Sequence, residues 1–114
     1  MSVECVFCNI KNKQIPSNIL FEDDYCFVIN DINPVAPVHL LVVPNNHFTY
    51  LDNLTDDFAP VIFKMFEAAK NMAFSKGVSE SGYRLVINQK SDAGQEVPHL
   101  HLHLTAGTKL KSLG

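Results

Sequence analysis

Apolar side chains recur every three or four positions over residues 55–76, and this spacing is typical of an amphipathic helix. Gly77 follows the last apolar position and is expected to end the helix. Pro60 restricts the start, because proline is tolerated in the first helical turn, where its missing N–H needs no partner. The pattern therefore predicts one long helix with Asp56 or Asp57 as its N-cap.

Several shorter apolar segments have the alternation or the β-branched content of strands. Strands are predicted over residues 19–22, 25–29, 39–43, 83–88 and 99–105. Asp23 and Asp24 form the turn of a hairpin, and residues 6–12 carry the apolar spacing of one or two helical turns. Short connections and one long helix across a face predict an α+β fold: a mostly antiparallel five-stranded sheet with one long helix and a short N-terminal helix.

The composition is that of one ordinary globular unit. The chain has 114 residues with no repeat, low-complexity segment or linker, so we expect a single domain over residues 1–114. A net charge of −3 without any run of Lys or Arg argues against nucleic acid or an anionic membrane as the main partner. No apolar stretch approaches the ~20 residues of a membrane span, and residues 1–4 begin no export signal. We expect a soluble cytoplasmic protein.

The segment of residues 99–104 alternates three histidines with three leucines. On a strand, this alternation places the imidazoles of His99, His101 and His103 on one face and the leucines, as core residues, on the other. An exposed strand face that happens to carry histidine is one interpretation. A three-histidine catalytic metal site is a second, and a histidine nucleophile for phosphoryl chemistry is a third.

The loop before these histidines favours phosphoryl chemistry. Gly94 allows the backbone to approach a ligand closely, and the N–H groups of Gly94, Gln95 and Glu96 can form a nest for an anion. Asn88, at the end of the preceding predicted strand, offers an amide donor or simply caps the turn. The position of this loop directly before the three histidines strengthens this interpretation.

Taken together, these motifs resemble the histidine triad family of nucleotide-binding proteins over nearly the whole chain. The matching blocks, in chain order, are Phe21-Glu22-Asp23-Asp24, Asp31-Ile32-Asn33-Pro34, Ala36-Pro37-x-His39, Val43-Pro44-x-x-His47, Gly94-Gln95-x-Val97 and the alternating His99-x-His101-x-His103. The chain is most similar to the purine nucleoside phosphoramidase branch, which hydrolyses nucleoside 5′-phosphoramidates and related AMP conjugates. Glu96 departs from the branch, which often has Ser there.

The resemblance implies roles for individual residues. His101 is implied as the nucleophile, with His39 and His103 flanking it. The implied nucleotide-binding residues are Val6, Phe7, Ile10, Ile29, Asp31, Ile32, Leu41, Asn88, Gly94, Gln95, Glu96 and Val97. Within that set, Asp31 is expected to hold the ribose hydroxyls, and Asn88 with the glycine loop to contact the α-phosphate. The residues expected to line the base pocket are Val6, Phe7, Ile10, Ile29, Ile32 and Leu41. The implied partners are purine nucleotides, namely AMP and adenosine or guanosine 5′-phosphoramidates.

A second group of residues contains sulfur. Cys5-x-x-Cys8 by itself is compatible with a redox pair, a free dithiol or half of a zinc site. The resemblance implies structural Zn²⁺ held by Cys5, Cys8, His47 and His99, with no metal required for catalysis. Cys26, between aromatic residues of a predicted strand, is expected to be a buried small hydrophobe.

The sequence therefore predicts a hydrolase that forms a covalent nucleotidyl-histidine on His101. A low-turnover purine nucleotide-binding sensor or scaffold is an alternative, as is a zinc-dependent hydrolase that uses the triad histidines as ligands. The apolar stripe of the long helix includes Phe63 and Phe66, which fits the homodimer of the family.

Overall fold

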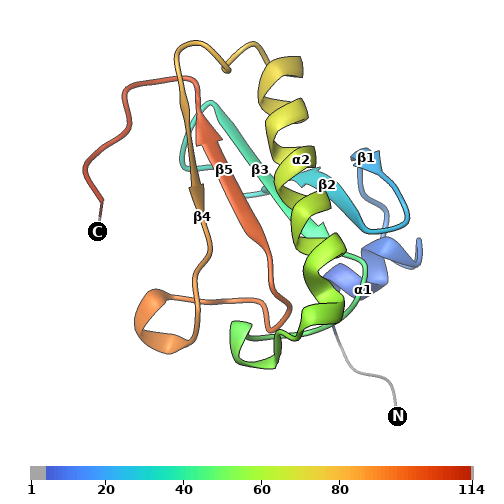
Figure 1. The fold of residues 1–114 in the computed structure, drawn as a ribbon. Helices are drawn as coiled ribbons and strands as arrows, with labels where there is room; N and C mark the ends of the chain where they lie inside the picture. The colour runs from blue at the N-terminus through green and yellow to red at the C-terminus, as the bar shows by residue number, and fades with distance from the viewer. Residues whose placement is uncertain (1–4, 114) are drawn as a thin grey trace.

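The computed structural model describes residues 5–113 and forms a five-stranded sheet with a helix on each face (Figure 1). The elements are α1 Val6–Lys11, β1 Ile19–Glu22, β2 Cys26–Asn30, β3 Val38–Pro44, α2 Ala59–Ser75, β4 Tyr83–Val86 and β5 Leu102–Ala106. The strand order is β1-β2-β3-β5-β4, and all neighbours are antiparallel. This architecture confirms the predicted α+β class. Residues 1–4, in which we expect no export signal, lie outside the described residues.

Two clusters of buried side chains lie on opposite faces of the sheet. Cys26 and Val28 of β2 belong to the cluster that packs against α2, whereas Phe27 and Ile29 belong to the cluster that packs against α1. This division follows from the two-residue period of a strand. Cys26 is fully buried, as predicted. The helix α1 thus covers its own face of the sheet, and the functional side chains described below lie on that face.

The start of α2 differs from the prediction. Asp56–Phe58 forms a separate 3-10 turn, and Phe58 takes the N-cap position without a side-chain hydrogen bond. Thr55 Oγ1 donates to Asp57 Oδ1 at 2.6 Å, so this carboxylate is engaged ahead of the helix. Pro60 lies in the first turn as predicted. Among the described residues, no helix has the length and apolar content needed to cross a membrane.

The strand predicted from His99 begins three residues later, at Leu102, and this part of the prediction is wrong. Pro98 has no N–H to donate to a ladder. The Pro44 carbonyl at the end of β3 accepts a hydrogen bond from His99 Nε2 at 2.9 Å. The ring of His99 thus takes the place of a backbone N–H that a neighbouring strand would otherwise donate to this carbonyl. His99 and His101 therefore lie in a bent segment that leads into β5.

The strand β4 forms one edge of the sheet and ends at Val86, two residues earlier than predicted. Asn88 follows it and donates from Nδ2 to the carbonyl of Ala93 at 2.8 Å, which closes the loop that leads toward the histidines. The segment after β5 extends away from the sheet beyond β4 (Figure 1). Within the described chain, the outer side of β4 has no neighbouring strand.

Candidate functional site

Three imidazoles from two neighbouring strands form one cluster. His39 lies on β3, His103 on β5, and His101 just before β5. The ring centroids of His101 and His103 are 4.9 Å apart, and those of His39 and His103 are 5.2 Å apart. His39 and His101 are each 6% exposed. The antiparallel pairing of β3 with β5 is what brings these residues together from distant parts of the sequence.

A main-chain amide sets the tautomer of His39. The N–H of Val35 donates to His39 Nδ1 at 3.1 Å, so Nδ1 carries a lone pair and the ring proton lies on Nε2. His39 Nε2 then donates to His103 Nδ1 at 2.9 Å. His103, accepting at Nδ1, carries its own proton on Nε2. Val35 was not among the predicted site residues. Its signal in the sequence is that the nearby prolines, Pro34 and Pro37, have no N–H to donate.

A main-chain carbonyl sets the tautomer of His101. The carbonyl of His99 is an acceptor only, and it lies 2.8 Å from His101 Nδ1, so Nδ1 is the donor and carries the proton. The neutral ring of His101 therefore has its lone pair on Nε2. A nitrogen lone pair is the form of imidazole that attacks an electrophile. Next to it, His103 is a hydrogen-bond donor at Nε2, so the two rings have complementary chemistry.

Burial keeps the neighbouring imidazole uncharged. Desolvation, together with nearby His101 and His39, lowers the pKa of His103 to about 4, although Asp31 opposes the shift. His103 is therefore neutral at pH 7. Asp31 Oδ2 lies 3.4 Å from His39 Nε2, but this contact is not an ion pair, because His39 accepts at Nδ1 and so is neutral.

The anion nest predicted at residues 94–96 forms only in part. The N–H of Gly94 donates to Ser91 O at 3.0 Å and the N–H of Gln95 to Lys90 O at 3.1 Å, so both amides close the loop instead of facing a ligand. Gln95 is also engaged through its side chain, which donates to Thr49 O at 3.1 Å. In the part of the chain that is described, no hydrogen bond engages the N–H of Glu96. Asn88 Nδ2 caps this loop through the Ala93 carbonyl, and its contact with the α-phosphate remains a prediction.

The structure divides the apolar residues predicted to line a base pocket. Four of them, Phe7, Ile10, Ile29 and Leu41, are buried together in the cluster under α1 and are each 7% exposed or less. Val97, another predicted nucleotide-binding residue, packs against this cluster. Val6 is 40% exposed and Ile32 is 91% exposed, so these two lie at the surface. The buried residues can form only the floor of a pocket there. Their contact with a base remains a prediction.

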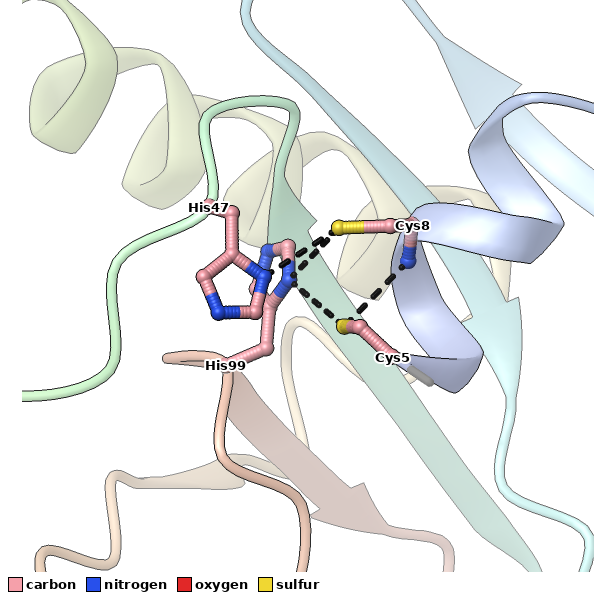
Figure 2. A group of neighbouring side chains, drawn as sticks. All are labelled: Cys5, Cys8, His47 and His99. Carbon is pink, nitrogen blue, oxygen red and sulfur yellow. Dashed lines mark hydrogen bonds between the residues drawn. The ribbon is translucent and has the colours of Figure 1, made fainter. Parts of the chain in front are cut away.

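The two cysteines meet two histidines beside α1 (Figure 2). Cys5 and Cys8 come from the N-terminal end of α1, His47 from the segment after β3, and His99 from the segment before β5. Their ligand atoms all lie within 4.8 Å of one another. Cys5 Sγ lies 3.3 Å from His99 Nδ1, and Cys8 Sγ lies 3.2 Å from His47 Nδ1. Two sulfur and two imidazole donors suit a tetrahedral zinc ion.

The ring of His99 is oriented for this cluster. Its Nε2 donates to the Pro44 carbonyl at 2.9 Å, so its Nδ1 lone pair points toward the sulfur atoms. Burial, together with His47 and His101, lowers the pKa of His99 to about 4, although the hydrogen bond to the Pro44 carbonyl opposes the shift. Burial raises the pKa of the Cys8 thiol to about 11, with Cys5 adding to the shift. A metal-binding ring held by a main-chain carbonyl is the usual outer-shell arrangement.

The metal-ligating geometry separates the triad histidines. Among the described residues, one possible ligand group contains His99 with the cysteines, and another contains Asp31, His39 and His103; neither contains His101. This grouping does not bring the three triad histidines together as ligands of one catalytic zinc. His39 Nε2 also carries a proton, since Val35 occupies Nδ1, and this opposes a metal in the second group.

Two hollows of the surface lie away from the histidines. One, of about 740 Å³, lies between the end of α2 and the segment after β5 and includes Arg84 and Lys109. The other, of about 490 Å³, lies at the start of α2 and includes Leu54 and Phe63. Neither contains a triad histidine. The chemistry of the imidazole cluster, and not the size of a hollow, therefore identifies the candidate site.

Comparisons with known proteins agree with this geometry. The HIT domain family matches residues 12–110. The purine nucleoside phosphoramidase of Escherichia coli (strain K12) is 36% identical over 110 residues, covering 96% of this chain and 92% of that protein. The solved structure of a HIT family hydrolase from Legionella pneumophila Philadelphia 1 has a TM-score of 0.91 at 41% identity, and the match covers 95% of this chain and 96% of that one. A HIT family hydrolase from Clostridium thermocellum has a TM-score of 0.93 at 38% identity, and the match covers 99% of this chain and 98% of that one. This chain belongs to the HIT domain family.

Proposed function

We propose that the protein hydrolyses purine nucleoside 5′-phosphoramidates or related AMP conjugates through a covalent nucleotidyl-histidine on His101. The observation that carries the proposal is the pair of fixed tautomers: a lone pair on His101 Nε2 beside an N–H on His103 Nε2. The activity of the Escherichia coli relative supports the choice of substrate class. A nucleophile and a hydrogen-bond donor on adjacent rings fit displacement at phosphorus.

The reaction uses these groups in two steps. His101 Nε2 forms a bond to the α-phosphorus as the P–N bond to the amine breaks, and the amine leaves with a proton taken from solvent. His103 donates from Nε2 to a phosphoryl oxygen, where negative charge increases in the transition state. Water then attacks the phosphorus and releases the 5′-monophosphate and the free imidazole. The unengaged N–H of Glu96 is available to a second phosphoryl oxygen.

Replacing the nucleophile tests this proposal. His101→Ala removes the attacking nitrogen of the proposed intermediate, so kcat for adenosine 5′-phosphoramidate should fall about a thousandfold or more. AMP binding by calorimetry and the circular dichroism spectrum should stay close to those of the wild type. A kcat near the wild-type value in His101→Ala would show that the nucleophile is misassigned.

Asp31 is proposed to bind the ribose hydroxyls. Its Oδ1 accepts from the N–H of Asn33 at 2.8 Å, which fixes the carboxylate at the start of the proline-containing loop. Among the described residues, its Oδ2 has only the long contact to His39, and the side chain is 19% exposed. One oxygen is therefore held by the protein while the other has acceptor capacity for a ligand.

A nucleotide without ribose hydroxyls tests that role. The 2′,3′-dideoxy analogue of AMP should bind about 10- to 100-fold more weakly than AMP, because a hydrogen bond to a charged group is lost. Asp31→Asn, which keeps an oxygen for Asn33, should bind AMP and the analogue with more nearly equal affinity. Equal affinity of the wild type for both nucleotides, measured by calorimetry, would remove this role from Asp31.

Zinc is the proposed ligand of the cluster formed by Cys5, Cys8, His47 and His99. With four protein ligands, a zinc ion there has no open position for water or substrate, so it supplies stability and no catalytic step. In this cluster the donor atoms join α1 to the segments after β3 and before β5. A zinc ion bound there would therefore hold three separate parts of the chain together.

The zinc proposal predicts separate effects on stability and chemistry. Wild-type protein should contain about one zinc per chain by elemental analysis. Cys8→Ser should lose the metal and lower the melting temperature by about 5 °C or more, while kcat at low temperature is largely kept. Cys26→Ala, in the other core cluster, should retain the metal. Prompt loss of kcat on brief chelation, with the circular dichroism spectrum unchanged, would instead indicate a catalytic metal.

A homodimer is proposed from the exposed face of α2. Phe63 is 63% exposed and Phe66 is 44% exposed, and β4 leaves an edge of the sheet free within the described chain. Adjacent apolar side chains on a surface helix are typical of an interface. Sedimentation velocity should give the wild type twice the monomer mass, and Phe63→Glu should reduce it to the monomer mass. A wild type that sediments as a monomer at micromolar concentration would contradict the dimer.

A further inference from the structure

Phe7 lies against two of the triad histidines instead of only lining a pocket. It is 4% exposed and lies on α1 between Cys5 and Cys8. Its ring centroid is 5.1 Å from that of His101 with an interplanar angle of 70°, and 5.6 Å from that of His99 with an angle of 86°. Both are edge-to-face contacts, an arrangement that aromatic rings favour.

Among the described residues, one hydrogen bond and two aromatic rings are the directional contacts of the His101 ring. One hydrogen bond, from Nδ1 to the His99 carbonyl at 2.8 Å, holds one atom of the imidazole. A single hydrogen bond leaves the ring free to tilt about the bonded atom, so packing must define the plane. In the described part of the chain, the aromatic rings that pack against it are those of Phe7 and His103, the latter with a centroid distance of 4.9 Å and an interplanar angle of 59°. The direction of the Nε2 lone pair therefore depends on Phe7.

The helix that carries Phe7 is itself fixed near His101. Cys5 Sγ caps α1 by accepting from the N–H of Cys8 at 3.5 Å, and it also lies 3.3 Å from His99 Nδ1. His99 in turn holds His101 through its carbonyl. The aromatic ring and the hydrogen-bond acceptor that orient His101 are thus connected to each other. This arrangement gives the ring of Phe7 a defined position relative to the imidazole.

We propose that Phe7 is a positioning residue that aims His101 Nε2 at the phosphorus, in addition to any contact with the base. The inference rests on the proposed function, in which His101 is the nucleophile. A role limited to the base pocket makes a different prediction, because it affects only substrates that carry a base. A positioning role affects the chemical step with any phosphoramidate that reaches His101.

Two substrates separate these roles. Phe7→Leu is assayed with adenosine 5′-phosphoramidate and with ribose 5-phosphoramidate, which has no base. We expect kcat/KM to fall by a similar factor, about 10- to 100-fold, with both substrates, and kcat with the adenosine substrate to fall as well, because small misplacement of a nucleophile is costly. Phe27→Leu is the matched control, since Phe27 is a buried phenylalanine in the same core cluster, and it should leave both values unchanged.

A loss confined to the adenosine substrate, expressed mainly in KM, would overturn the proposal. Phe7→Met, which keeps the apolar volume without the ring, serves if Phe7→Leu does not fold by circular dichroism. If the wild type hydrolyses neither substrate, the proposed function fails, and a crystal structure of the Phe7 variant decides the inference. Rotation of the His101 ring away from its wild-type plane supports positioning, whereas an unchanged ring with Nδ1 still on the His99 carbonyl overturns it.

Discussion

Main-chain hydrogen bonds to histidine rings are the constraint on which the site depends. The Val35 amide, the His99 carbonyl and the Pro44 carbonyl each engage one ring nitrogen and thereby determine which nitrogen keeps a lone pair. Backbone groups do not titrate, so they hold these tautomers without adding charge to a buried cluster. His101 becomes a lone-pair donor at Nε2 and His103 a proton donor at Nε2. Identical side chains thus acquire opposite chemistry from their surroundings.

His99 connects the two parts of the site. Its ring faces the sulfur atoms of Cys5 and Cys8, while its carbonyl holds His101. The bend before β5 makes this possible, because a regular strand would use that carbonyl and the Pro44 carbonyl in ladder bonds. The same bend keeps Leu100 and the following leucines buried against the α2 face. The first histidine of the motif is therefore proposed to be structural and the second to be chemical.

The sequence predicted those features that depend on side-chain type and period. The α2 stripe, the antiparallel strands and the facing of histidines and leucines follow from apolar spacing, and the convergence of Cys5, Cys8, His47 and His99 followed from the family resemblance. The sequence did not reveal the local backbone conformation and the hydrogen bonds of individual backbone groups. They include the bend at His99, the 3-10 turn ahead of α2, and the loop amides of Gly94 and Gln95 that close on their own carbonyls. These depend on which backbone groups remain unpaired once the sheet has formed, and residue type does not encode that.

The protonation pattern of the rings tests the central claim most directly. Nitrogen-15 chemical shifts of the imidazoles, with two-bond couplings to the ring protons, identify the protonated nitrogen of each histidine at neutral pH. The account predicts the Nδ1–H form for His101 and the Nε2–H form for His39 and His103. A neutral His101 with its proton on Nε2 would contradict it, because that nitrogen would then have no lone pair with which to attack phosphorus.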